Sequence, residues 1–142
     1  MLYTHGIFDG QRAALGASLG IEAGEVDYSA FPLFSLFSQT LGASVVVPNM
    51  DTTKPGSVDP LPVLEAFERY GVTYAFGSPA FWRRLVSSER RSSLSPLRRI
   101  LMAGAPAPPD LLRSLVASLG PDADVFTPYG ATESLPVTMP SA

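Results

Sequence analysis

The chain has no cysteine among its 142 residues. This absence excludes a disulfide framework, a thiolate zinc site and a cysteine nucleophile, and it fits a reducing compartment. We therefore expect a cytoplasmic protein. Histidine is almost absent too: the one residue, His5, falls in a predicted first helical turn, where a solvated or structural role is favoured over catalysis.

Charge is also scarce, at 16% of the residues with a formal net charge of −3. A nucleic-acid-binding protein usually has a basic balance or a basic face, so no nucleic-acid partner is expected. Residues 28–50 carry no charge, but proline, glycine and hydroxyl-bearing residues interrupt them. We expect no transmembrane segment there and interpret the stretch as buried interior. Its residues Phe31, Phe34 and Phe37 suit either a plain core or the lining of an apolar tunnel, and both interpretations stay open. The first residues lack the basic and apolar segments of a secretory signal.

What the sequence does contain is an alternation of helical and strand patterns, within a composition that is 46% hydrophobic. Apolar spacing and capping residues predict helices over about 4–19, 60–70 and 109–119, and a further helix that opens near Pro79 and carries Phe81, Trp82 and Leu85. Short apolar runs predict strands over 44–47, which we expect to be buried, and over 72–76, 100–103 and 125–127. Such alternation predicts an α/β fold in which a parallel sheet is flanked by helices.

Three polar or glycine-containing segments directly follow predicted strands. They are Gly77-Ser78-Pro79, Gly104-Ala105-Pro106 and Tyr129-Gly130-Ala131-Thr132. In parallel sheets ligands bind at the carboxyl ends of the strands, so a single edge of the sheet should gather all three segments. This edge is the candidate site.

The segment from Tyr129 to Glu133 combines groups that suit a nucleotide. An aromatic ring can stack on a base, a threonine hydroxyl can bond a phosphate oxygen, and a carboxylate can hold Mg²⁺ beside phosphate. An ordinary turn with a surface glutamate has the same composition. The residues of this segment alone leave both interpretations open.

An aromatic-Gly-x-Thr-Glu segment after a strand resembles the signature of the adenylate-forming (AMP-binding, acyl-CoA synthetase-like) superfamily. Four further segments resemble its motifs in the family's order: Tyr3-Thr4-His5-Gly6, Phe31-Pro32-Leu33-Phe34, Gly71-Val72-Thr73 with Gly77-Ser78-Pro79, and Leu97 to Pro106. The resemblance implies ATP and Mg²⁺ as cofactors, and attack of a carboxylate on the α-phosphorus of ATP to give acyl-AMP and pyrophosphate.

The resemblance also assigns roles to residues of this chain. As catalytic residues it implies Thr132, at the α-phosphate, and Glu133, which is also the magnesium ligand. The adenine site implied by the family consists of Gly104, Ala105, Pro106, Tyr129, Gly130 and Ala131. Phe34 and Ser35 would contact the acyl substrate.

Two parts of the family pattern have no counterpart in this chain. The phosphate-binding loop would lie before Tyr3, and the C-terminal domain with its catalytic lysine would follow Ala142. Residues 1–142 are therefore expected to be part of the large N-terminal adenylation domain, inactive by themselves. Residues 52–56 have the wrong order and position for the phosphate loop, and we assign them to an ordinary loop.

Within the superfamily, residues 126–137 look most like the β-lactone synthetases of bacterial olefin biosynthesis. This resemblance implies a long-chain β-hydroxy fatty acid whose own hydroxyl displaces AMP. Ser35 stands where many acyl-CoA synthetases have histidine, which makes coenzyme A a doubtful partner. Two alternatives remain: a fatty acyl-CoA synthetase, and a non-catalytic nucleotide-binding or structural fragment.

Other enzyme classes lack their motifs here. The chain has neither the Gly-x-Ser-x-Gly elbow of serine hydrolases nor a P-loop. Six arginines lie within residues 83–99, and this cluster favours a solvated connection, with anion binding as the alternative.

Overall fold

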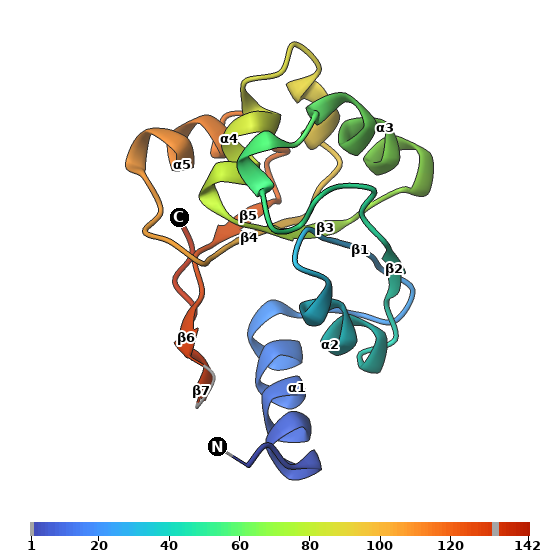
Figure 1. Cartoon of the computed structure of the whole chain (residues 1–142), viewed down its shortest axis with the longest axis vertical. Coiled ribbons are helices and arrows are strands. Elements are labelled where there is room, and N and C mark those ends of the chain that lie inside the picture. Colours follow the sequence, from blue (N-terminus) through green and yellow to red (C-terminus); the bar gives the residue numbers. More distant parts are fainter. Residues whose placement is uncertain (1, 132–133) are drawn as a thin grey trace.

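A computed structural model describes residues 2–131 and 134–142 of the chain (Figure 1). The helices are α1 (His5–Leu19), α2 (Ser35–Thr40), α3 (Pro60–Tyr70), α4 (Pro79–Val86) and α5 (Pro109–Val116), with short 3₁₀ turns η1 (Pro32–Phe34), η2 (Pro55–Ser57) and η3 (Arg91–Leu94). The strands are β1 (Val26–Ser29), β2 (Ser44–Val46), β3 (Tyr74–Gly77), β4 (Arg99–Met102), β5 (Asp124–Phe126), β6 (Tyr129–Ala131) and β7 (Ser134–Thr138).

Within the described residues, five strands form one parallel sheet in the order β2-β1-β3-β4-β5. Helices α3, α4 and α5 cover one face of the sheet, and α1 and α2 cover the other (Figure 1). Each face has its own apolar core: Trp82, Phe81 and Leu64 are fully buried on the first face, while Leu15 and Phe37 pack on the second. The predicted α/β fold with a helix-flanked parallel sheet is confirmed.

The predicted helix starts and ends are confirmed where a capping residue marks them. Thr4 caps α1 by accepting a hydrogen bond from the amide of Ile7, and Gly20 ends this helix in the left-handed conformation. The side chains of Asp59 and Ser78 cap α3 and α4 in the same way. The last predicted helix is shorter than expected, because α5 ends at Val116 and not near residue 119.

Two expectations of burial were wrong, and one strand was missed. The stretch 28–50 was expected to be buried interior, but Phe31, Leu33 and Leu36 are exposed. Strand β1, which lies second in the sheet, was missed because Asp27 and Ser29 break its apolar pattern. The run 44–47 was expected to be buried, but β2 is an edge strand and the next residue, Val47, is 79% exposed.

The arginine-rich stretch 83–99 is also more structured than a solvated connection. Arg99 is largely buried and binds both carboxylate oxygens of Glu25, whose side chain is 4% exposed. Its second terminal nitrogen donates to the carbonyl oxygen of Gly20 at the end of α1. The ion pair therefore ties β4 to the start of β1 and to α1.

No helix within residues 2–131 and 134–142 is long and apolar enough to cross a membrane, as expected.

Candidate functional site

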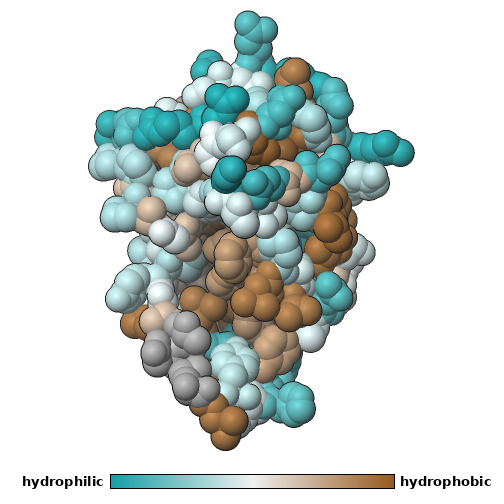
Figure 2. All heavy atoms as spheres, in the orientation of Figure 1, coloured by the Kyte–Doolittle hydropathy of each residue, from teal (hydrophilic) through white to brown (hydrophobic). Residues whose placement is uncertain are grey.

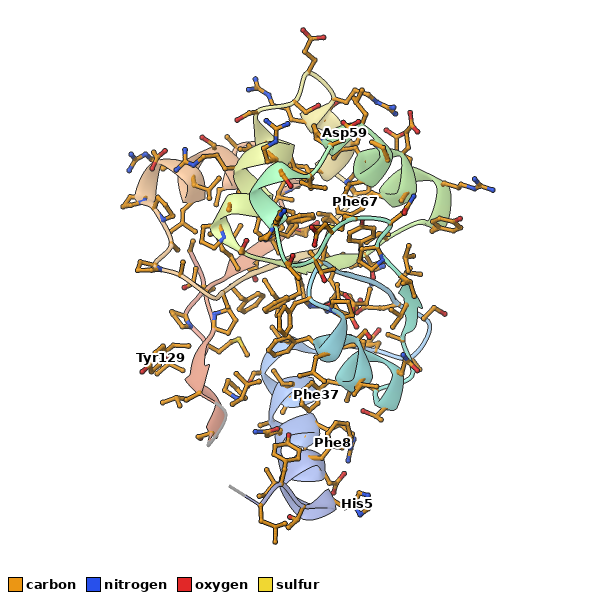
Figure 3. All side chains as sticks on the ribbon, viewed as in Figure 1. His5, Phe8, Phe37, Asp59, Phe67 and Tyr129 are labelled. Atoms are coloured by element: carbon orange, nitrogen blue, oxygen red, sulfur yellow. The ribbon has the colours of Figure 1, made fainter. Side chains whose placement is uncertain are left out.

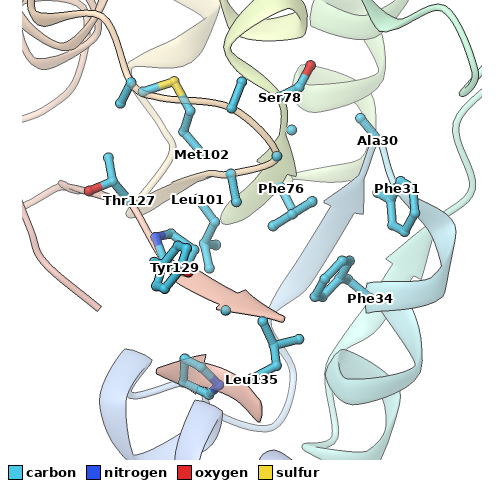
Figure 4. A pocket seen from close by; sticks show the side chains of 18 of the residues that line it. Ala30, Phe31, Phe34, Phe76, Ser78, Leu101, Met102, Thr127, Tyr129 and Leu135 are labelled. Carbon is cyan, nitrogen blue, oxygen red and sulfur yellow. The ribbon is translucent and has the colours of Figure 1, made fainter. Parts of the chain in front are cut away.

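A pocket of about 840 Å³ opens at the carboxyl ends of the parallel strands. All three segments singled out by the sequence contribute to its lining: Gly77 and Ser78 at the end of β3, Gly104 to Pro106 after β4, and Tyr129 with Gly130 after β5 (Figure 4). The structure therefore brings these segments together at one edge of the sheet. This position is the usual ligand site of an open parallel sheet.

One side of the pocket is an apolar wall. Five of its residues pack on the face of the sheet that α1 and α2 cover: Leu15, Phe34, Phe76, Leu101 and Leu135. Ala30 and Phe31, which follow β1, complete it. Phe34 stacks on Phe76 with ring centroids 4.4 Å apart, and Figure 4 shows both rings at the cavity. Figure 2 shows hydrophobic side chains gathered around a hollow in the middle of the molecular surface that faces the viewer. Such a wall suits an aliphatic or aromatic group.

The opposite side of the pocket is made of backbone-rich segments. Gly104 has φ +91°, a conformation that L side chains rarely adopt, and it begins the turn with Ala105 and Pro106. The ring of Tyr129 is 67% exposed and points away from the body of the molecule (Figure 3), where it is free to stack on a planar group. A flat ligand could lie between these segments and the sheet edge.

Gly130 has a structural reason to be glycine that is independent of any ligand. A Cβ at this position would lie 2.4 Å from Leu135 Cδ1 and 3.0 Å from the carbonyl oxygen of Ser134, because β6 and β7 form a tight antiparallel hairpin. This hairpin was not predicted. Since its second strand carries Leu135 into the pocket, it completes the apolar wall.

Two predicted site residues, Ser35 and Ala131, do not line the pocket, and two more lie outside the described residues. Ser35 lies just outside it, and its hydroxyl donates to the carbonyl oxygen of Pro32. Ala131 is exposed at the end of β6. Thr132 and Glu133 lie outside the described residues.

Sequence reasoning missed the contribution of the loop after β2. Thr52 and Pro55 line the pocket, although residues 52–56 were assigned only to an ordinary loop; Pro55 begins the short 3₁₀ turn η2. The signal was available, because β2 was predicted and the loop that follows a parallel strand reaches the same edge as the loops of its neighbours.

The described lining contains no charged side chain. Likewise, residues 2–131 and 134–142 hold no group of three or more His, Asp or Glu side chains that could bind a metal ion. Burial raises the pKa values of Asp27, Tyr28 and Tyr74, mainly by desolvation, and none of these three side chains lines the pocket. The described pocket can therefore hold apolar and planar groups. If its ligand carries phosphate, residues outside this lining must neutralise the phosphate charge.

The sequence profile of AMP-binding enzymes matches residues 27–142. The chain belongs to this family. The matched range includes every element of the pocket except Leu15 of α1.

Individual relatives agree with the family. The chain is 45% identical over 139 residues to the olefin β-lactone synthetase of Stenotrophomonas maltophilia and 43% identical over 137 residues to that of Xanthomonas campestris pv. campestris; these matches cover 98% and 96% of this chain. They cover only 25% and 24% of the relatives, so the chain spans about a quarter of their length.

A solved relative has the same fold. The o-succinylbenzoate CoA synthetase MenE of Bacillus subtilis superposes on 97% of this chain with a TM-score of 0.78 and 26% sequence identity, and the match covers 28% of MenE. The pocket therefore lies in a segment whose fold is that of adenylate-forming enzymes.

Proposed function

We propose that the full-length protein carrying this chain activates a fatty carboxylic acid with ATP, giving acyl-AMP and pyrophosphate. The observation that carries this proposal is the pocket itself, where an apolar wall meets three loop segments at the carboxyl edge of the sheet. Membership of the AMP-binding enzyme family supports the nucleotide, and the stacked Phe34 and Phe76 rings support an apolar substrate.

In this proposal the chain's own residues bind and orient the reactants. The turn from Gly104 to Pro106 and the ring of Tyr129 hold the adenine, with Gly130 and Ala131 beside it. Two observations support ATP on this side of the pocket: no atom crowds the turn at Gly104, and Tyr129, which lines the same pocket, is exposed. Phe34 contacts the acyl group, with Ser35 near it.

Other residues are assigned to the negatively charged phosphates of ATP and to the metal ion. Thr132 contacts the α-phosphate and Glu133 binds Mg²⁺, which neutralises phosphate charge and orients the phosphates. Because the described lining is uncharged, we also propose that residues 1–142 are part of a larger N-terminal domain. A phosphate loop and a lysine from outside this chain would supply the positive charge.

For the substrate, we propose a long-chain β-hydroxy acid that closes to a β-lactone. In the second step the β-hydroxyl oxygen attacks the carbonyl carbon of the acyl-AMP and forms the ring C–O bond. The bond from this carbon to the phosphate oxygen breaks, AMP leaves, and the hydroxyl proton is released. Two relatives named olefin β-lactone synthetases, each more than 40% identical to this chain, support this choice.

Transfer of the acyl group to coenzyme A is the second candidate, supported by the fold shared with a CoA synthetase. Product analysis separates the two. The full-length protein, given ATP, Mg²⁺ and a β-hydroxy acid without coenzyme A, should release pyrophosphate and AMP and form a β-lactone detectable by mass spectrometry. Strict dependence of product formation on coenzyme A would refute lactone formation and support acyl transfer.

The roles of individual residues need a separate test. Glu133→Ala should lower kcat/KM for Mg-ATP by at least about a hundredfold, since it removes a metal ligand at the reacting phosphate. The matched control is Glu89→Ala, an exposed glutamate that follows α4 and does not line the pocket, and it should behave like wild type. Normal pyrophosphate release by the Glu133 variant would overturn its assignment.

A further inference from the structure

The turn from Gly104 to Pro106 lines the pocket but has little support of its own. All three of its residues are exposed, and no atom apart from its chain neighbours lies within 4 Å of the place where a Cβ on Gly104 would stand. Within the described residues, neither Gly104 nor Ala105 donates a hydrogen bond to another backbone group, and Pro106 has no N–H to donate. The position of the turn therefore depends on the two elements that it joins, β4 and α5.

The first end of the turn is held by a buried tryptophan. Trp82 on α4 is fully buried, and its Nε1 donates a 3.2 Å hydrogen bond to the carbonyl oxygen of Leu101, the penultimate residue of β4. A buried indole N–H usually finds such a partner, because an unpaired one costs free energy. Ala103, directly after β4, donates at 3.3 Å to the carbonyl oxygen of Gly77. Among the described residues this is the last backbone bond before the turn, so the Trp82 bond supports the strand where its pairing ends.

The second end of the turn is held by the next residue of the same helix. Arg83 Nη1 lies 2.9 Å from Asp110 Oδ2, in the first turn of α5. A carboxylate at this position is also favoured by the dipole of the helix. Both side chains are more than half exposed, so this contact is weaker than the buried one.

Helix α4 is well placed to support both ends. Ser78 caps its start and lines the pocket, and Phe81 is fully buried in the core between this helix and the sheet. Successive residues of an α-helix point about 100° apart, so Trp82 reaches β4 while Arg83 reaches α5, the neighbouring helix on the same face (Figure 1).

We propose that Trp82 and Arg83 are positioning residues that together fix both ends of the turn from Gly104 to Pro106. Trp82 acts through the Leu101 carbonyl and Arg83 acts through Asp110, and neither of the two side chains lines the pocket itself. The consequence for ATP rests on the proposed function, in which this turn holds the adenine. The support of the two ends does not rest on it.

Hydrogen exchange in the full-length protein tests the first contact without using activity. Trp82→Phe keeps an aromatic ring but removes the N–H, so the opening constant of the Ala103 amide should rise about tenfold. The matched control, Phe67→Leu, shrinks a buried aromatic side chain that packs on Tyr28 in the same core and should leave Ala103 opening within twofold. Unchanged Ala103 opening in Trp82→Phe, or an equal rise in the control, would overturn the role of Trp82.

The same measurement tests the second contact with a variant that leaves the core intact. Arg83→Gln should raise the opening constant of the Leu112 amide, which bonds to the carbonyl oxygen of Pro108 at the start of α5, about threefold. The matched control is Arg69→Gln, which removes the same charge from an exposed position in the last turn of α3 and should leave Leu112 unchanged. No rise in Arg83→Gln, or the same rise in both variants, would overturn the role of Arg83.

Kinetics of the full-length protein test the consequence for ATP. KM for ATP should rise about tenfold in Trp82→Phe and about threefold in Arg83→Gln. KM for the fatty acid should rise less than twofold in both, because residues of α1, β3 and β7 also form the acyl wall. Both control variants should keep both constants, which separates positioning of the turn from a loss of stability and from a general attraction between ATP and positive charge. Equal rises in the two constants would refute positioning. If wild type consumes no ATP with any fatty acid, the proposed function fails, and the exchange experiments still decide both contacts.

Discussion

The Glu25–Arg99 ion pair gives the sharpest prediction for stability. Glu25 is buried and accepts hydrogen bonds of 2.9 and 2.8 Å from Arg99 Nη1. Arg98 also reaches Glu25, at 3.2 Å, but its side chain is 62% exposed. Removing one member of the buried pair leaves the other charge without its partner in a site of low polarity.

The magnitudes follow from burial. Glu25→Gln and Arg99→Met should each lower the free energy of unfolding by about 3–5 kcal/mol, since each leaves a buried charge unpaired. The double variant should lose about as much as one single variant, because no unpaired charge remains. The coupling energy then equals one single-variant loss, about 3–5 kcal/mol. Arg98→Ala should cost less than about 1 kcal/mol, because solvent screens an exposed partner.

Urea unfolding at pH 7 measures these values. Trp82 is the single tryptophan of the chain and is fully buried, so its fluorescence reports unfolding of the core. If the double variant lost the sum of the two single-variant losses, to within about 0.5 kcal/mol, the reasoning would be refuted. So would a loss from Arg98→Ala as large as that from Arg99→Met.

Three further predictions use the same unfolding assay. Gly77→Ala should cost about 1–3 kcal/mol, because the added Cβ would lie 2.3 Å from Cδ1 of buried Phe81; an unchanged stability would show that Phe81 moves freely. Gly104→Ala should cost about 1–2 kcal/mol from its positive φ alone, since no atom crowds the site, and a wild-type value would contradict this. Burial raises the pKa of Asp27 from 3.8 to about 6, so the folded state retains a proton that the unfolded state releases. Wild-type stability should therefore fall by up to about 3 kcal/mol as the pH rises from about 4 to about 6, whereas Asp27→Asn should lack this component; the same decrease in both proteins would contradict the assignment.

Local signals in the sequence were enough to predict most of the fold. Thr4 and Gly20 mark the start and end of α1, and Asp59 and Gly71 mark those of α3. These signals are local, because a capping residue acts on helix ends within a few residues of itself. Strand β1 was missed because Asp27 looks like a surface residue in sequence. Its partners, Ser38 and the neighbouring strand β3, become visible only in the folded structure.

The site was predictable where a segment directly follows a recognised strand. The segments at Gly77, Gly104 and Tyr129 meet at one pocket for this reason. The Glu25–Arg99 contact was not predictable, since 74 residues separate the partners and no local pattern links them. Leu15 and Leu135 join the apolar wall from opposite ends of the chain, and this too depends on tertiary packing.

The central claim is that the pocket at the carboxyl edge of the sheet belongs to an enzyme that adenylates fatty acids. Exchange of labelled pyrophosphate into ATP by the full-length protein tests this claim most directly, because exchange requires reversible formation of acyl-AMP. We predict exchange that depends on the fatty acid and on Mg²⁺ and that proceeds without coenzyme A. Exchange that is absent with every fatty acid tested, or that is equally fast without any acid, would contradict the claim.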